Sequence, residues 1–314
     1  MTNNPKDNFI IVDHINGYLM PNAPDIYVMK RATPFFNVPE MIMGSMMADD
    51  GNLKFTPDEL DAFLKTEPAA KKWIRPLVGG DDFINGKRRY CLWLVDCPPN
   101  ELRRMPRVYE RVRNVREYRL SSKRAATRKL ADKPTLFAEM RQPTTNYLLI
   151  PKVSSERRRY IPIGYMTADN IAVNTVLMIP NASLFHFGVL TSCVHMNWMR
   201  MVAGRLTSRY QYSATICYNP FPWPLFYTDE QQKRIEATAQ AILDARANYP
   251  NATYADLYDE VSMPADLRKA HTENDREVMK AYRFREDIPE LAMQIVLLNS
   301  YQTLHEEFDL EDDE

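Results

Sequence analysis

The sequence has few of the features by which most enzyme sites are recognised. Only 9 of its 314 residues are glycine, against 22 prolines, which argues against a glycine-rich loop around a phosphate group. It contains no GxGxxG or Walker sequence, no HExxH and no recognisable Ser–His–Asp signature. These absences predict a chain without catalytic or cofactor-binding residues of its own.

Cysteines and long apolar runs are also scarce. The four cysteines, Cys91, Cys97, Cys193 and Cys217, form no CxxC pair, so we expect reduced thiols and no metal site. No apolar run approaches the ~20 residues that span a bilayer, and no signal peptide is visible. With 45% apolar and 26% charged residues, the composition is that of a globular protein. We therefore expect a cytoplasmic protein with no membrane partner.

The net charge of −1 hides a strong segregation of charge along the chain. Residues 101–160 contain 17 Lys and Arg against 6 Asp and Glu, whereas residues 228–314 contain 9 against 21. This asymmetry predicts a basic working surface in the middle of the chain and an acidic, solvated end. A polyanion is the natural partner of the basic part. The alternative is a basic helix that the acidic end neutralises.

The periodicity of apolar residues predicts an α+β fold. We expect a mixed, largely antiparallel β domain with flanking helices, followed by a small C-terminal helical cap. Thr56 and Thr228 each precede a helix as a capping residue. Strands are predicted at 88–95, 147–164 (two, around a turn) and 171–179. Helices are predicted after Thr56, at 106–131 and 183–202, and after Thr228, Pro264 and Ile288.

Three segments carry groups suited to a nucleic acid. Two of them would contact phosphates. The predicted helix 106–131 buries Met105, Val108, Val112, Val115 and Tyr118 and presents Lys123, Arg124 and Arg128, although such a helix can also be merely solvated. The turn between the strands of 147–164 offers Lys152, Ser154, Ser155, Arg157, Arg158 and Arg159.

The third segment is Gly204–Ser213, which reads as one half-buried strand. At period two, Arg205, Thr207, Arg209, Gln211 and Ser213 fall on the outer face, and Leu206, Tyr210 and Tyr212 fall on the inner one. Arg pairs well with guanine O6 and N7, and Gln with adenine N6 and N7. The face therefore favours reading base edges, with a solvated strand face as the alternative.

The turn Tyr218–Pro224 (YNPFPWP) is similar to the Asn/Asp-Pro-Pro-aromatic turn of amino-group DNA methyltransferases. Phe221 separates its prolines, however, and no glycine-rich methyl-donor loop precedes it. We therefore expect a proline-rich turn at a domain boundary rather than a catalytic role for Asn219.

Taken in order, several motifs resemble one family, the MmeI-like fused type II restriction–modification enzymes and related adenine-specific DNA methyltransferases. They are Arg88–Leu94 (RRYCLWL), Val153–Gly164 (VSSERRRYIPIG), Phe185–Ser192 (FHFGVLTS), Gly204–Leu206 (GRL), Arg209–Ser213 (RYQYS), Tyr218–Pro224 and Leu267–His271 (LRKAH). The resemblance runs from about Ile15 to the last predicted helix. It covers only the part of such an enzyme that follows its methyltransferase.

The resemblance implies a module that recognises a sequence in double-stranded DNA and lacks the catalytic domain. Residues 1–30 would connect to the methyltransferase, residues 31–227 would form the target recognition domain, and residues 228–314 the C-terminal helical domain. Thr207, Arg209 and Gln211 would read bases. Arg205 and the cations and serines named above would contact the DNA backbone. S-adenosylmethionine would bind the absent methyltransferase domain, a partner in cis or in trans.

Two other functions stay open at this point. One is an active S-adenosylmethionine-dependent DNA methyltransferase whose donor site is not recognised in the sequence. The other is a protein-interaction module in which the acidic C-terminal helices dock a partner.

Overall fold

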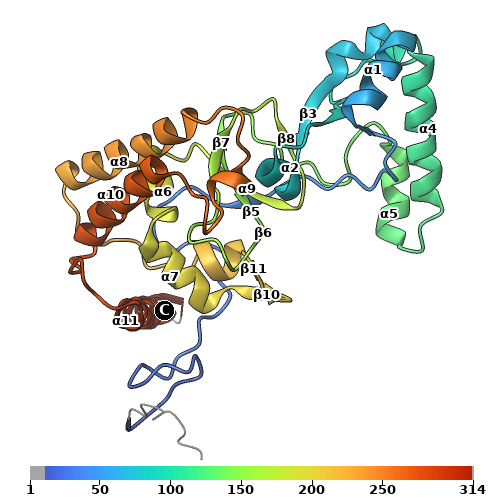
Figure 1. The fold of residues 1–314 in the computed structure, drawn as a ribbon. Coiled ribbons are helices and arrows are strands. Elements are labelled where there is room, and N and C mark those ends of the chain that lie inside the picture. Colours follow the sequence, from blue (N-terminus) through green and yellow to red (C-terminus); the bar gives the residue numbers. More distant parts are fainter. Residues whose placement is uncertain (1–10, 313–314) are drawn as a thin grey trace, which may run out of the picture.

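The computed structural model of the chain describes residues 11–312. The first ten residues of the predicted connecting segment, and residues 313–314 of the acidic end, lie outside this range. The arrangement is α+β as predicted, with open sheets and flanking helices (Figure 1). The predicted domain boundaries at 30/31 and 227/228 remain predictions.

A small lobe with its own hydrophobic core lies on the right in Figure 1. Its sheet has the order β2-β4-β3-β8, in which only the β3–β8 pair is parallel. Its elements are β2 (Lys54–Phe55), α1 (Pro57–Thr66), the 3₁₀ turn η1 (Pro68–Trp73), β3 (Ile74–Val78), β4 (Arg89–Leu92), α3 (Pro99–Leu102), α4 (Pro106–Leu120), α5 (Ala125–Lys129), η2 (Leu130–Asp132) and β8 (Ile171–Ala172). The predicted cap of α1 is confirmed, because Thr56 and Glu59 hydrogen-bond each other's backbone amides.

The prediction of one helix over 106–131 was wrong. The chain leaves the helix after Leu120 and resumes it at Ala125. Arg119 is buried, and its guanidinium donates to the backbone carbonyls of Met47, Ala48 and Leu130 rather than to solvent. Tyr118 is 41% exposed and not part of the core. The other four apolar positions, from Met105 to Val115, are buried as predicted.

The larger body is built on a second sheet, of order β1-β9-β5-β7, in which every pair is antiparallel. Its strands are β1 (Ile42–Met43), β5 (Tyr147–Pro151), β7 (Gly164–Met166) and β9 (Val176–Pro180). The helical elements around it are α2 (Gly80–Asn85), α6 (Leu184–Leu190), α7 (Cys193–Val202), the π turn η3 (Ala214–Tyr218), α8 (Asp229–Ala247), α9 (Tyr254–Leu257), α10 (Ala265–Ala281) and α11 (Glu290–Asp312). Thr228 and Gln231 form the predicted capping box at the start of α8.

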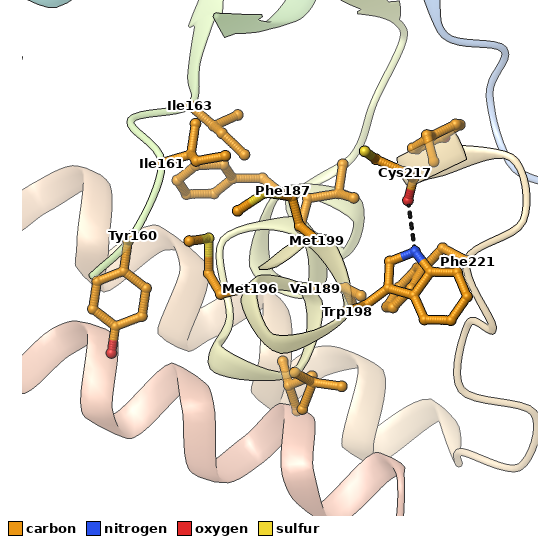
Figure 2. Close-up of a cluster of buried hydrophobic side chains, with 14 of the residues drawn as sticks. Tyr160, Ile161, Ile163, Phe187, Val189, Met196, Trp198, Met199, Cys217 and Phe221 are labelled. Atoms are coloured by element: carbon orange, nitrogen blue, oxygen red, sulfur yellow. Dashed lines mark hydrogen bonds between the residues drawn. The ribbon is translucent and has the colours of Figure 1, made fainter. Parts of the chain in front are cut away.

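The C-terminal helices share one core with this sheet. That core includes Ile161 and Ile163 beside the sheet, Phe187 of α6 and Trp198 of α7, together with apolar residues of α8, α10 and α11 (Figure 2). The Trp198 indole Nε1 donates to the carbonyl oxygen of Cys217 at 3.0 Å. Because apolar side chains of α8, α10 and α11 are buried in the same core as the sheet, the hydrophobic effect holds the C-terminal helices on the β domain.

Residues 183–202 form two helices, so the prediction of one helix was wrong. The chain turns at Thr191 and Ser192, both fully buried. The Ser192 hydroxyl donates to Val189 O at 2.7 Å and accepts from His195 N at 3.4 Å, so this serine both ends α6 and caps α7. His195 is buried and hydrogen-bonded, with its Nε2 2.8 Å from the Tyr212 hydroxyl.

The burial of His195 predicts a loss of stability in mild acid. Burial lowers the pKa of His195 from 6.5 to about 3. Below pH 6.5 the unfolded chain binds a proton here that the folded chain excludes, so the stability present above pH 6.5 is lost as the pH falls toward 3. At pH 5 we expect this residue alone to lower the free energy of unfolding by about 2 kcal/mol relative to pH 7.

Urea unfolding of the wild type and His195→Gln at pH 7 and pH 5 measures this contribution. Glutamine keeps an amide near the position of Nε2 and does not titrate. The variant should therefore lose about 2 kcal/mol less between the two pH values. Equal losses in the two proteins would contradict the assignment, because all other titrating groups are shared.

Candidate nucleic-acid interface

Residues 204–211 form a β-hairpin and not the single strand that was predicted. Strand β10 (Gly204–Leu206) pairs antiparallel with β11 (Arg209–Gln211), and β11 pairs with β6 (Val153–Ser154). Thr207 and Ser208 form the two-residue turn. Sheet β10-β11-β6 therefore joins two of the segments expected to contact DNA.

Thr207 is the reason that the sequence did not show this turn. Its φ is +57°, a conformation in which a β-branched residue is strained. Two-residue hairpin turns usually place glycine, asparagine or aspartate where φ is positive, and none stands here. Strained residues concentrate at functional sites. Thr207 is also exposed at the tip of the hairpin, where a ligand would meet it.

The turn changes which side chains share a face. In the register, Arg205 lies opposite Tyr210, and Leu206 opposite Arg209. Partners in an antiparallel pair project to the same side, so Arg205 lies on the Tyr210 face and not with Arg209 and Gln211, which corrects the prediction. Its guanidinium stacks 3.8 Å from the Tyr210 ring. Leu206 is 46% exposed, whereas Tyr210 and Tyr212 are buried as predicted and anchor the hairpin.

Arg209 and Gln211 are exposed and border a hollow of about 420 Å³ (the hairpin hollow). Arg158, Lys152 and Ser155 from the β6 segment line it as well. The rest of its lining comes from β6 itself, from α2 and from the turn before β9; these residues are Val153 and Ser154, then Gly80, Asp81, Ile84 and Asn85, then Asn174 and Thr175. The structure thus brings together most of the residues predicted on the hairpin and the β6 segment.

Asn85, Asn174 and Thr175 are polar residues of this hollow that the sequence analysis did not select. The backbone of Thr175 is fixed by the amide of Lys152, which donates to its carbonyl at 3.1 Å. The Thr175 hydroxyl accepts from Gly80 N at 3.0 Å, which ties α2 to the same turn. No local pattern marks these residues, because two separate segments of the chain, α2 and the turn before β9, bring them to one place.

Three consecutive arginines lie in the segment between β6 and β7. We call residues Glu156–Arg159 of this segment the arginine turn. Arg157 and Arg159 are exposed, and Arg158 is half-buried with no hydrogen-bond partner for its Nε. Hydrogen bonding from its own backbone amide lowers the pKa of Glu156, with further contributions from Ser208 and from Arg157 and Arg205. The one acid of the turn is therefore held ionised beside the hairpin tip.

Ser154, one of the predicted contacts to the DNA backbone, is buried in the structure. It is 2% exposed, because β6 pairs with β11 at this residue and turns its side chain inward. Its hydroxyl group is buried without a hydrogen-bond partner among the described residues, and a contact of Ser154 with DNA stays a prediction. Ser155, one residue further, is half-exposed and lines the hairpin hollow.

Lys123, Arg124 and Arg128 lie on the small lobe, away from the hairpin (Figure 1). All three are exposed around the break between α4 and α5. The Arg128 guanidinium donates to the carbonyls of Ser122 and Lys123, both at 2.9 Å, so this side chain stabilises the loop itself. The structure therefore places the predicted phosphate contacts in two separate regions.

The Asn219 side chain is buried and hydrogen-bonded to the protein backbone. It is 4% exposed, and its side-chain Nδ2 donates to the carbonyls of Arg31 and Ala32 at 2.9 and 2.8 Å. The turn thus fixes the N-terminal segment against the body. Within residues 11–312, no group of three or more His, Cys, Asp or Glu could hold a metal ion, and no helix has the length and apolarity to cross a membrane.

Comparisons with known proteins agree with this arrangement. The family described as "MmeI, target recognition domain" matches residues 22–225, and "MmeI, C-terminal domain" matches residues 227–308. "DNA methyltransferase A" of Bacillus subtilis (strain 168) is 36% identical over 296 residues, which is 94% of this chain and 33% of that protein.

A solved structure of the Type IIL restriction-modification enzyme MmeI in complex with DNA superposes with a TM-score of 0.91 at 43% identity. The match covers 95% of this chain and 39% of that one. The chain therefore spans between a third and two fifths of the length of these two relatives. It belongs to the MmeI family, with a target recognition domain followed by an MmeI C-terminal domain.

Proposed function

We propose that this chain recognises a specific sequence in double-stranded DNA and directs a methyltransferase to it. The observation that carries the proposal is the hairpin itself. Arg209 and Gln211 project from one exposed face, beside a hollow that Lys152 and Arg158 also line. Base-edge readers and phosphate-binding cations thus share one site. MmeI, which has the same fold over this region, is described in complex with DNA.

The two kinds of side chain have different tasks in this mechanism. Arg209 presents the geometry for guanine O6 and N7, and Gln211 that for adenine N6 and N7. The strained Thr207 places a hydroxyl at the tip of the same hairpin. Lys152, Arg157 and the other cations would bind phosphates, and each such contact adds about 0.9 to the log–log salt slope of binding.

Methyl transfer, in this proposal, belongs to another domain, joined in cis or acting in trans. S-adenosylmethionine would bind there and not to this chain. The turn most similar to a methyltransferase motif does not fit that role, because backbone carbonyls already occupy the Asn219 side chain. The chain would then be no enzyme by itself and would work in the cytoplasm, where bacterial DNA lies. Titration with S-adenosylmethionine should accordingly give no binding heat.

Selection of bound duplexes from a random pool at moderate salt tests the proposal. We expect one short motif to be enriched over successive rounds. Retention of DNA without enrichment would leave only a non-specific polyanion-binding protein. Absence of binding at low salt would reject the proposal altogether.

A further inference from the structure

The arginine turn is held at its end by the C-terminal helices. Tyr160, which directly follows Arg159, is 1% exposed, and its hydroxyl donates to Asp275 Oδ2 of α10 at 2.6 Å. Its ring stacks on His271 of the same helix, with 4.2 Å between centroids and 18° between planes. Figure 2 shows the Tyr160 side chain at the edge of the core, with its hydroxyl directed toward α10.

Asp275 is itself fixed in this position. It is 5% exposed, and its Oδ1 accepts from Cys193 N, at the start of α7, at 2.7 Å. Burial raises the pKa of Asp275 to about 6. Burying this carboxylate costs free energy, which a hydrogen bond to each of its oxygens offsets. Replacing Asp275 by an apolar residue would leave the Tyr160 hydroxyl and Cys193 N unpaired.

A second attachment lies a few residues further along the chain. Arg246 of α8 is 7% exposed and donates through Nη1 to Ile163 O at 2.7 Å and through Nε to the Tyr258 hydroxyl at 2.7 Å. Tyr258 in turn lies 2.8 Å from His271 Nε2. The segment that leads from the arginine turn into β7 is thus bound to α8 and α10 by one buried network.

The turn has little internal support by comparison. Arg157 N donates to Ser155 Oγ at 3.2 Å and Arg158 N to Ser155 O at 3.3 Å, both long for hydrogen bonds. Other contacts come from outside the turn: Arg200 of α7 donates to Arg159 O at 2.9 Å, and Ser208 of the hairpin hydrogen-bonds the Glu156 side chain. The position of the three guanidiniums therefore depends on the helices rather than on the turn itself.

We propose that Tyr160 and Asp275 are positioning residues for DNA binding, through which the C-terminal helices hold Arg157–Arg159 beside the hairpin. The inference rests on the proposed function. Side chains that are ordered before binding lose less conformational entropy when the complex forms, so the same contacts give a higher affinity. The C-terminal domain then contributes to phosphate binding without touching DNA through these residues.

Tyr160→Phe tests the proposal, because phenylalanine keeps the ring stacked on His271 and removes only the hydroxyl. Tyr165→Phe is the matched control, since the Tyr165 hydroxyl is buried without a hydrogen-bond partner. The full chain is titrated with a labelled random-sequence duplex at several salt concentrations, after its active fraction is measured by stoichiometric binding. We expect Tyr160→Phe to weaken binding about tenfold and to lower the log–log salt slope by roughly one to two, and Tyr165→Phe to do neither.

A double-mutant cycle distinguishes positioning of the arginines from a general effect of Tyr160 on the fold. In a background that carries Arg157→Ala, Arg158→Ala and Arg159→Ala, Tyr160→Phe should have no further effect, because no guanidinium is left to position. Asp275→Asn gives a second readout, since its amide can still accept from Cys193 N and pair with the Tyr160 hydroxyl. We expect Asp275→Asn to bind within about threefold of the wild type, and Asp275→Ala to bind as weakly as Tyr160→Phe.

Two results would overturn the inference. An unchanged affinity and salt slope in Tyr160→Phe, with a clear loss in the triple arginine variant, would show that the arginines need no positioning. A tenfold loss that persists in the triple-variant background would show that Tyr160 acts elsewhere. If the wild type bound no duplex and the triple variant behaved identically, the proposed function would fail together with the inference.

Discussion

Arg119→Met is expected to unfold the small lobe while the rest of the chain stays folded. The guanidinium is 1% exposed and donates to five backbone carbonyls, at 2.8 to 3.0 Å. These carbonyls belong to Met47, Ala48, Leu130, Lys133 and Leu136. The carbonyls of Ala48 and Leu136 would be left without a donor, which costs about 1–3 kcal/mol each. The carbonyls of Met47, Leu130 and Lys133 keep a backbone amide but lose a charge-assisted hydrogen bond, so a total loss of at least about 4 kcal/mol is expected.

Hydrogen exchange followed by mass spectrometry locates this effect. Amides of α4 and β4 should exchange much faster in the variant, whereas those of α8 and α10, which belong to the other core, should keep their protection. Arg116→Met is the control, because Arg116 is exposed on the same helix. Unchanged protection of α4 in Arg119→Met would show that the carbonyls find water or other donors.

The same arginine shows where a count of charges along the chain loses information. The segment 101–160 was correctly identified as basic, yet three of the chain's arginines serve packing rather than binding. Arg119 and Arg246 are buried, and Arg111 lies 4.2 Å over the ring of Phe55. A guanidinium that ties backbone segments together and one that binds phosphate are identical in sequence. Only the tertiary position separates them.

Local signals predicted the elements that depend on local physics. The caps of α1 and α8 were predicted because a threonine hydroxyl and an acidic or amide side chain three residues later satisfy free amides in the first turn. Four breaks were missed, at Ser121, Asn174, Ser192 and Thr207, and none of them contains glycine or proline; at Asn174, the single strand predicted at 171–179 divides into β8 and β9. Buried Arg119 fixes the first break through hydrogen bonds to distant carbonyls, and the pairing of β11 with both β10 and β6 fixes the hairpin. At Ser192 the hydroxyl group caps α7 within a fully buried turn.

Much of the candidate site was predictable for a similar reason. Alternation in β11 places Arg209 and Gln211 outward whatever strand pairs with it. The face of Arg205 depends on the turn, so the prediction of that face was wrong. The burial of Ser154 depends on the pairing of β6 with β11, which the local pattern does not show. The contribution of Asn174 to the hairpin hollow depends on the packing of two sheets, which no periodicity records.

Arg209→Ala is expected to relax the preference for one base pair of the selected site and to leave the other positions unchanged. A good bidentate contact to a base contributes about 1–3 kcal/mol of discrimination, which is roughly 5- to 150-fold. Binding of the selected duplex and its single-base-pair variants, measured at fixed salt, gives this value at each position. Arg205→Ala is the matched control, because Arg205 lies in the same hairpin on the opposite face, stacked on Tyr210.

Arg158→Ala should behave differently from Arg209→Ala. As a phosphate contact, Arg158 should weaken every duplex alike and lower the log–log salt slope by about 1. Arg158 and Arg209 line the same hollow. If one substitution weakens all duplexes alike and the other changes the preference for one base pair, the difference must come from the part of the DNA that each side chain contacts. If Arg209→Ala instead lowered all affinities equally, the hairpin would be a backbone clamp, and the base-reading role would have to move to the opposite wall of the hollow, at Asn85, Asn174 and Thr175.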